Sequence, residues 1–221
     1  MRLIFYSGGE VKQNKNLDDV LISKIANPTP QMTYIPYAHY ESEIHFKEFV
    51  EQYQIYGIEK FIYFPVDVPY DQILLREVLK SDIIHLSGGN TFYFLASLKK
   101  HKLMPLLKTF VKRGGILSGL SAGAIIMTPS IDTAAYPEFD CDENYEGLKN
   151  FSSFNLVNFH FYPHYKNSKR YDKALKHFSK KIDAPLYACP DGAGIFLDDQ
   201  QLRFIGQTAC FYQGKKFILN K

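Results

Sequence analysis

The sequence predicts an α/β protein with a mostly parallel β-sheet and helices on both faces. Short, continuous apolar runs that end at or near glycine or proline alternate with longer stretches in which apolar residues recur at helical spacing. Continuous apolar runs are typical of strands that are buried on both faces. Their alternation with helices is typical of a parallel sheet, because each crossover between parallel strands needs a long connection.

The first half of the chain carries this pattern most clearly. Strands are expected at residues 3–6, 32–35, 61–64, 83–86 and 116–118, and helices at residues 41–56, 71–79, 91–98 and 104–112. In the first of these helices, the apolar spacing is seen in Phe46, Phe49, Val50 and Tyr53.

After Tyr136 the pattern becomes irregular until a helix near residues 168–182. A strand is expected at 158–162, and further strands at 186–189, 194–197, 202–205 and 215–219. We expect the last four to extend the same sheet at its edge. Since no linker, repeat or low-complexity segment separates these elements, residues 1–221 are interpreted as a single domain.

The composition limits the class of function. The chain has 221 residues, 46% of them hydrophobic, and a formal net charge of +3, which is too small a bias to suggest a nucleic-acid partner. Cys141, Cys189 and Cys210 lack the spacing of a zinc site or a disulfide framework, so a reducing cytoplasm is expected. The apolar run at the N-terminus is too short for a signal peptide or a membrane span, and no membrane association is expected.

The stretch GGILSGLSAGAII, residues 114–126, predicts a strand, a sharp turn and a helix, with Ser121 at the turn. Gly119 and Gly123 suit such an elbow, because a serine on a strained turn needs neighbours with little or no side chain. The helix that starts at Ala122 points its N-terminal N–H groups toward negative charge forming near Ser121. The pattern favours a nucleophile, and the alternative is a tight connection that happens to hold a serine.

A serine nucleophile needs a base, and the base needs an orienting acid. His164, in FYPHYKN, follows a predicted strand and a proline, whereas the other histidines are interpreted as surface or core residues. Asp191, in ACPDGAGI, is the candidate acid at another strand end, although Pro-Asp-Gly is also a common turn sequence. Asp140 and Asp142 are the rival acids, since they lie between the serine and the histidine in sequence.

The order serine, histidine, aspartate differs from the Ser–Asp/Glu–His order of the α/β-hydrolases. Four motifs instead resemble, in the same order, the peptidase E family of serine peptidases, which includes aspartyl dipeptidases and cyanophycinases. They are SGGNTFYFL (87–95), GLSAGA (119–124), YPHY (162–165) and PDGAG (190–194). The resemblance covers nearly the whole chain. It implies a fold similar to the class I glutamine amidotransferase domain, with serine in place of cysteine at the elbow.

By position, the resemblance implies that Ser121 is the nucleophile, His164 the general base and Asp191 the third member of the triad, where the family often has glutamate. It implies that the backbone N–H groups of Gly89 and Ala122 form the oxyanion hole. Two N–H groups from two glycine-rich turns can converge on a developing oxyanion without an intervening side chain.

The resemblance also suggests substrate-binding residues. Asn90 either orders its loop or contacts the substrate. The aspartyl dipeptidases carry an aspartate about fifteen residues after the nucleophile, where this chain has Tyr136, which weakens the expectation of Asp-X dipeptides. Arg170 matches an arginine that binds an acidic side chain, and the alternative is a solvated residue on a helix face. The loop at residues 134–147 is expected either to line or cover the pocket or to be a surface loop.

These observations predict a serine peptidase that hydrolyses small peptides, with dipeptides carrying an acidic N-terminal residue as one possible class. It is expected to need no metal or cofactor and to be a monomer or a homodimer. The alternative is a catalytically silent binding or regulatory protein on the same scaffold. Glutamine amide hydrolysis is a third, weaker interpretation, because it would need a cysteine at position 121.

Overall fold

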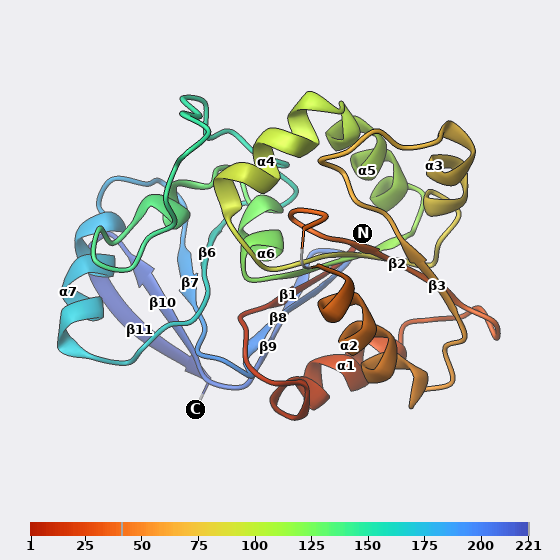
Figure 1. Cartoon of the computed structure of the whole chain (residues 1–221). Coiled ribbons are helices and arrows are strands. Elements are labelled where there is room, and N and C mark those ends of the chain that lie inside the picture. Colours follow the sequence, from red (N-terminus) through yellow and green to blue (C-terminus); the bar gives the residue numbers. More distant parts are fainter. Residues whose placement is uncertain (41, 221) are drawn as a thin grey trace.

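The computed structural model describes residues 1–40 and 42–220 (Figure 1). Its larger sheet has seven strands in the order β3-β2-β4-β5-β1-β8-β9. The strands are β1 (Arg2–Tyr6), β2 (Gln31–Ile35), β3 (Lys60–Tyr63), β4 (Ile83–Leu86), β5 (Ile116–Leu120), β8 (Gly194–Asp198) and β9 (Gln201–Ile205). The first five are parallel to one another, while β8 is antiparallel to β1, and β9 to β8.

Helices cover both faces of this sheet, as predicted (Figure 1). One face packs against α1 (Lys15–Ile22) and α2 (Ser42–Gln54). The other packs against α3 (Gln72–Val78), α4 (Thr91–Lys100), α5 (Leu103–Lys112) and α6 (Ala122–Ile126). Two short 3-10 helices, η1 (Val11–Asn14) and η2 (Asp132–Ala135), lie close to the carboxyl ends of the strands.

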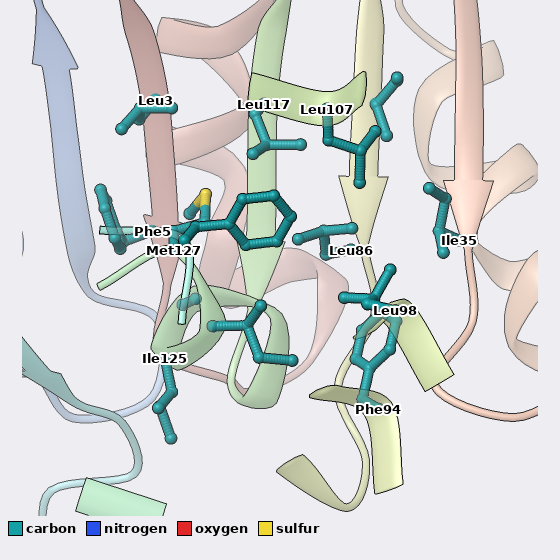
Figure 2. Packing of buried hydrophobic residues seen from close by; sticks show 14 of the residues in the cluster. Leu3, Phe5, Ile35, Leu86, Phe94, Leu98, Leu107, Leu117, Ile125 and Met127 are labelled. Atoms are coloured by element: carbon teal, nitrogen blue, oxygen red, sulfur yellow. The ribbon is translucent and has the colours of Figure 1, made fainter. Parts of the chain in front are cut away.

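Strand β1 explains why its apolar run is continuous. Leu3 and Phe5 point into the core beneath α4, α5 and α6, and Ile4 and Tyr6 point into the core beneath α1 and α2. All four side chains are buried, because successive residues of a strand face opposite sides of the sheet. Figure 2 shows Leu3 and Phe5 beside Leu117 of β5, within the larger of these two cores.

The C-terminal part of the chain corrects one prediction. Strands β8 and β9 do extend the large sheet, but the remaining strands form a second sheet in the order β11-β10-β7-β6. These strands are β6 (His160–Tyr162), β7 (Leu186–Ala188), β10 (Thr208–Tyr212) and β11 (Lys215–Asn220), and α7 (Lys169–Phe178) packs on them. The expectation that 186–189 and 215–219 join the large sheet is wrong, because β7 pairs with β6 and β10 instead.

Some element boundaries also differ from the predictions. Helix α1 and strand β10 were not predicted, and β5 runs two residues further than expected, to Leu120. The predicted start of the second helix, Glu41, lies outside the described residues. Across residues 1–40 and 42–220, no helix combines the length and the apolar character that crossing a membrane requires.

Candidate active site

Ser121 occupies a strained elbow between β5 and α6. Its backbone has φ 49° and ψ −106°, a conformation that side-chain-bearing residues rarely adopt. A Cβ on Gly119 would lie 2.4 Å from the carbonyl carbon of Gly123, and a Cβ on Gly123 would lie 2.3 Å from the carbonyl oxygen of Leu86. Both glycines are therefore required for the helix to pack this closely on the strands, and the turn holds the Ser121 hydroxyl out from the sheet.

The structure brings Ser121, His164 and Asp191 together in one hydrogen-bonded chain. His164 Nε2 lies 2.8 Å from Ser121 Oγ, and His164 Nδ1 lies 2.7 Å from Asp191 Oδ1. The side chains of His164 and Asp191 are both about half exposed, at 47%. A hydroxyl, an imidazole and a carboxylate in this order can activate the hydroxyl as a nucleophile, with the carboxylate orienting the ring.

Ser7, which follows β1, holds His164 in place. The His164 N–H donates to Ser7 Oγ over 2.7 Å, and Ser7 Oγ donates to the Cys189 carbonyl over 2.6 Å. Ser7 is fully buried, and His164 has φ 54°, so this pair of bonds supports a backbone conformation that a histidine seldom takes. Sequence reasoning gave Ser7 no role.

Gly8 lies directly against the hydrogen-bonded side chains of His164 and Asp191. A Cβ at this position would lie 2.2 Å from His164 Cε1 and 2.6 Å from Asp191 Oδ1. Only glycine leaves room for the imidazole and the carboxylate to meet here. The signal that could have identified it is its place at the carboxyl end of the central strand β1, where loops of a parallel sheet converge on a site.

The backbone N–H groups of Ala122 and Gly89 are available to an oxyanion, whereas those of Ser121 and Gly123 are already bonded. The N–H of Ser121 donates to the Tyr6 carbonyl over 2.9 Å, and the N–H of Gly123 donates to the Ser87 carbonyl over 3.1 Å. Within the described part of the chain, no acceptor takes the N–H of Ala122 or of Gly89. Ala122 is the first residue of α6, where N–H groups have no partner inside the helix.

A cavity of about 400 Å³ opens in front of Ser121. Residues of its lining include Thr91, Ser121, Asp140, Cys141, Asp142, Tyr162, His164, Lys166 and Asp191. The loop at residues 134–147 therefore contributes to the lining of the cavity. This agrees with the expectation that the loop lines the pocket, and not with the alternative of a surface loop. Pockets of this size accommodate small ligands.

The rival acids have other partners. Asp142 Oδ2 accepts the N–H of Thr91 at the start of α4 over 2.8 Å, and Asp140 Oδ2 accepts the Tyr171 hydroxyl over 2.6 Å. The bond to Asp140 raises the pKa of Tyr171, and the phenol of Tyr171 raises the pKa of the neighbouring Lys166. Of the three aspartates that line the cavity, Asp191 is the one that bonds to His164.

The three predicted substrate-binding residues are not gathered around Ser121. Asn90 caps α4, with Oδ1 accepting the Tyr93 N–H over 2.9 Å and Nδ2 donating to the Glu143 carbonyl over 2.8 Å. The Tyr136 hydroxyl donates to the Ala174 carbonyl, and its ring stacks on Phe178. These contacts occupy both side chains, and neither residue lines the cavity.

Arg170 also lies outside the lining of the cavity. Its guanidinium stacks on the ring of Phe139, 3.5 Å from the ring centroid. Lys166 is the basic residue that does line the cavity, and sequence reasoning did not identify it. The available signal was its position two residues after His164, in the same strand-end loop.

Cys189 is not a candidate nucleophile, and the described residues hold no metal cluster. Burial raises the pKa of Cys189 to about 12, which keeps this thiol protonated and unreactive at neutral pH. Residues 1–40 and 42–220 contain no group of three or more histidine, cysteine or acidic side chains arranged to hold a metal ion.

The fold and the elbow are those of the class of proteins in which a serine stands at a strand-to-helix turn. Residues 3–205 match the profile of peptidase family S51, and the chain belongs to this family.

Relatives of known name agree with this assignment. An uncharacterised peptidase from Pasteurella multocida is 35% identical over 100 residues, which are 45% of this chain and 47% of that protein. Peptidase E from the same species is 31% identical over 141 residues, covering 58% of this chain and 56% of that protein. The chain thus spans about half the length of the curated relatives it matches. The crystal structure of a peptidase from an acI-B1 actinobacterium superposes with a TM-score of 0.75 at 19% identity, covering 99% of this chain and 93% of the other, which supports the fold.

Proposed function

We propose that this protein hydrolyses small peptides through a triad of Ser121, His164 and Asp191. The observation that carries the proposal is the continuous hydrogen-bonded chain from Ser121 Oγ through the imidazole to Asp191 Oδ1, with bonds of 2.8 and 2.7 Å. The strained elbow and the unpaired N–H groups of Gly89 and Ala122 support the same role.

In the proposed reaction, His164 Nε2 takes the proton of Ser121 as Oγ bonds to the peptide carbonyl carbon. The carbonyl oxygen becomes an oxyanion, which the N–H groups of Gly89 and Ala122 stabilise. The C–N bond then breaks as His164 donates its proton to the leaving amine. Water, deprotonated by His164, hydrolyses the acyl-enzyme and returns Ser121 to its starting state. Asp191 keeps Nδ1 protonated and stabilises the imidazolium that forms in both steps.

The cavity supports small substrates, because its volume of about 400 Å³ suits a short peptide and the loop at residues 134–147 forms part of its wall. A peptide with an acidic N-terminal residue would find Lys166 as its cationic partner, since Arg170 stacks on Phe139. The same wall carries Asp140 and Asp142, which can attract the free ammonium group of a short peptide.

The test is hydrolysis of a dipeptide panel with varied N-terminal residues by the wild type and by Ser121→Ala. Alanine fits the same turn and removes only the hydroxyl, so kcat is expected to fall by about 10³-fold or more while the circular dichroism spectrum stays unchanged. Activity near that of the wild type in Ser121→Ala would rule out the proposed nucleophile.

A further inference from the structure

The loop that carries Gly89 is joined to the end of β2 through Ser87. The Ser87 N–H donates to the Ile35 carbonyl over 3.0 Å, and Ser87 Oγ accepts the Tyr37 N–H over 2.8 Å. The Ser87 carbonyl in turn accepts the N–H of Gly123, in α6, over 3.1 Å. Ser87 is buried, so these bonds fix the start of the loop, before the chain reaches Gly89.

Gly89 itself needs a further support. It has φ 134°, a conformation that residues with a side chain rarely adopt, and glycine is free to leave it for several others. A second cavity, of about 410 Å³, is lined by Gly88, Gly89 and Tyr37 among other residues, so the loop borders open space on that side. The backbone bonds of Ser87 therefore do not by themselves fix the direction of the Gly89 N–H.

The ring of Tyr37 supplies this support. A Cβ on Gly89 would lie 2.1 Å from Tyr37 Cδ1 and 2.2 Å from Tyr37 Cγ, so the ring fills the space in which another residue would carry its side chain. Tyr93, in α4, lies edge-to-face with this ring, with the ring centroids 6.4 Å apart. The Tyr93 hydroxyl donates to the buried carboxylate of Asp67 over 3.2 Å. The N–H of His39, two residues after Tyr37, donates to the same carboxylate over 3.0 Å, so the chain is anchored on both sides of the ring.

We propose that Tyr37 is a positioning residue that holds the Gly89 N–H toward the oxyanion formed at Ser121. The proposal rests on the proposed function for the role of this N–H. Ring carbons make the contact with Gly89, so the ring is required and the hydroxyl is not. Without the ring, the glycine-rich segment can turn toward the second cavity, and the oxyanion loses one of its two donors.

The experiment compares Tyr37→Phe, which keeps the ring, with Tyr37→Leu, which removes it. The first readout is the order parameter of the Gly89 N–H from ¹⁵N relaxation, which requires no catalysis. We expect a value of about 0.85, typical of rigid backbone, in the wild type and in Tyr37→Phe, and a value below about 0.6 in Tyr37→Leu. A Gly89 N–H that is as ordered in Tyr37→Leu as in the wild type would overturn the proposal.

The second readout is steady-state hydrolysis of a dipeptide. Tyr37→Leu should lower kcat about 10²-fold and change KM by less than about two-fold, because an oxyanion donor acts in the transition state and not in substrate binding. Tyr37→Phe should keep the wild-type kcat. An equal loss of kcat in both variants, or an effect confined to KM, would also overturn the proposal.

Tyr70→Leu is the matched control, since Tyr70 is likewise partly buried against the larger core and lines neither cavity. It should lower Tm and leave kcat unchanged, which separates loss of packing from loss of the donor. An equal loss of kcat in Tyr70→Leu and Tyr37→Leu would assign the effect to packing and overturn the proposal. Failure of the proposed function would appear instead as hydrolysis by Ser121→Ala at the wild-type rate, and the relaxation readout would still test whether Tyr37 holds Gly89.

Discussion

Replacement of Gly8 by alanine tests the geometry of the triad without touching any of its members. The new methyl group would lie 2.2 Å from His164 Cε1, whereas ordinary contact begins at 3.4 Å, so the imidazole must withdraw by about 1 Å. Gly8 is not among the residues with positive φ, so alanine adds no backbone strain there. Displacement of a catalytic group by about 1 Å typically lowers the rate about 10²-fold, and we expect kcat/KM to fall by that amount.

The fold should survive this substitution, because the side chains of His164 and Asp191 are about half exposed and can move toward solvent. The assay is steady-state hydrolysis of the best dipeptide substrate, with Tm measured on the same samples. Gly57→Ala is the control, since Gly57 has nothing within 4 Å of an added Cβ and lies at a surface turn with φ 81°, so it should lose about 1 kcal/mol of stability and no activity. Wild-type kcat/KM in Gly8→Ala would refute the arrangement described here.

The remaining predictions concern the acid, the buried histidine and metal dependence. Asp191→Asn is expected to lower kcat by roughly 10²- to 10⁴-fold with little change in KM, whereas Asp140→Asn and Asp142→Asn should keep more activity; the reverse ranking would transfer the role to one of those residues. His85 has a folded-state pKa of about 3 against about 6.5 when unfolded, so its stabilisation is present above pH 6.5 and is lost as the pH falls toward 3. The free energy of unfolding should therefore drop by about 2 kcal/mol more between pH 7 and pH 5 in the wild type than in His85→Gln, measured by urea titration, and equal drops would contradict this. Peptide hydrolysis should continue in EDTA, and its loss with recovery on adding zinc would contradict the metal-free mechanism.

The large sheet could be predicted because burial on both faces leaves a direct mark on the sequence. In β1, Leu3 and Phe5 serve one core and Ile4 and Tyr6 the other, so the run has no polar member. Helix α1 could also have been predicted, because Leu17, Val20 and Leu21 recur at the spacing of a helix face. Sequence reasoning missed this pattern, and all three side chains are buried in the structure.

The division of the C-terminal strands into two sheets could not be predicted in the same way. Apolar content identifies a strand but not its partner, since pairing is decided by contacts between distant segments. Strand β8 pairs with β1, almost two hundred residues earlier, while β7 pairs with β6 and β10. No local sequence pattern shows that β6, β7, β10 and β11 form a sheet of their own.

The candidate site likewise has a part that the sequence could predict and a part that it could not. Ser121, His164 and Asp191 each follow a predicted strand, and the carboxyl ends of strands converge, so their proximity could be anticipated. Tyr136 lies in a segment without a regular pattern, and Arg170 lies in α7. Their contacts with Phe178 and Phe139 depend on how α7 packs against the loop at residues 134–147. Their roles in substrate binding stay predictions.

The central claim is that Ser121 is an activated nucleophile, and covalent labelling tests it most directly. The protein is incubated with a fluorophosphonate, and the modified residue is located by mass spectrometry. We predict a single adduct on Ser121 in the wild type, greatly slowed labelling in His164→Ala and no adduct at this position in Ser121→Ala. An unlabelled Ser121 in folded wild-type protein would contradict the claim and favour a binding or regulatory protein on this scaffold.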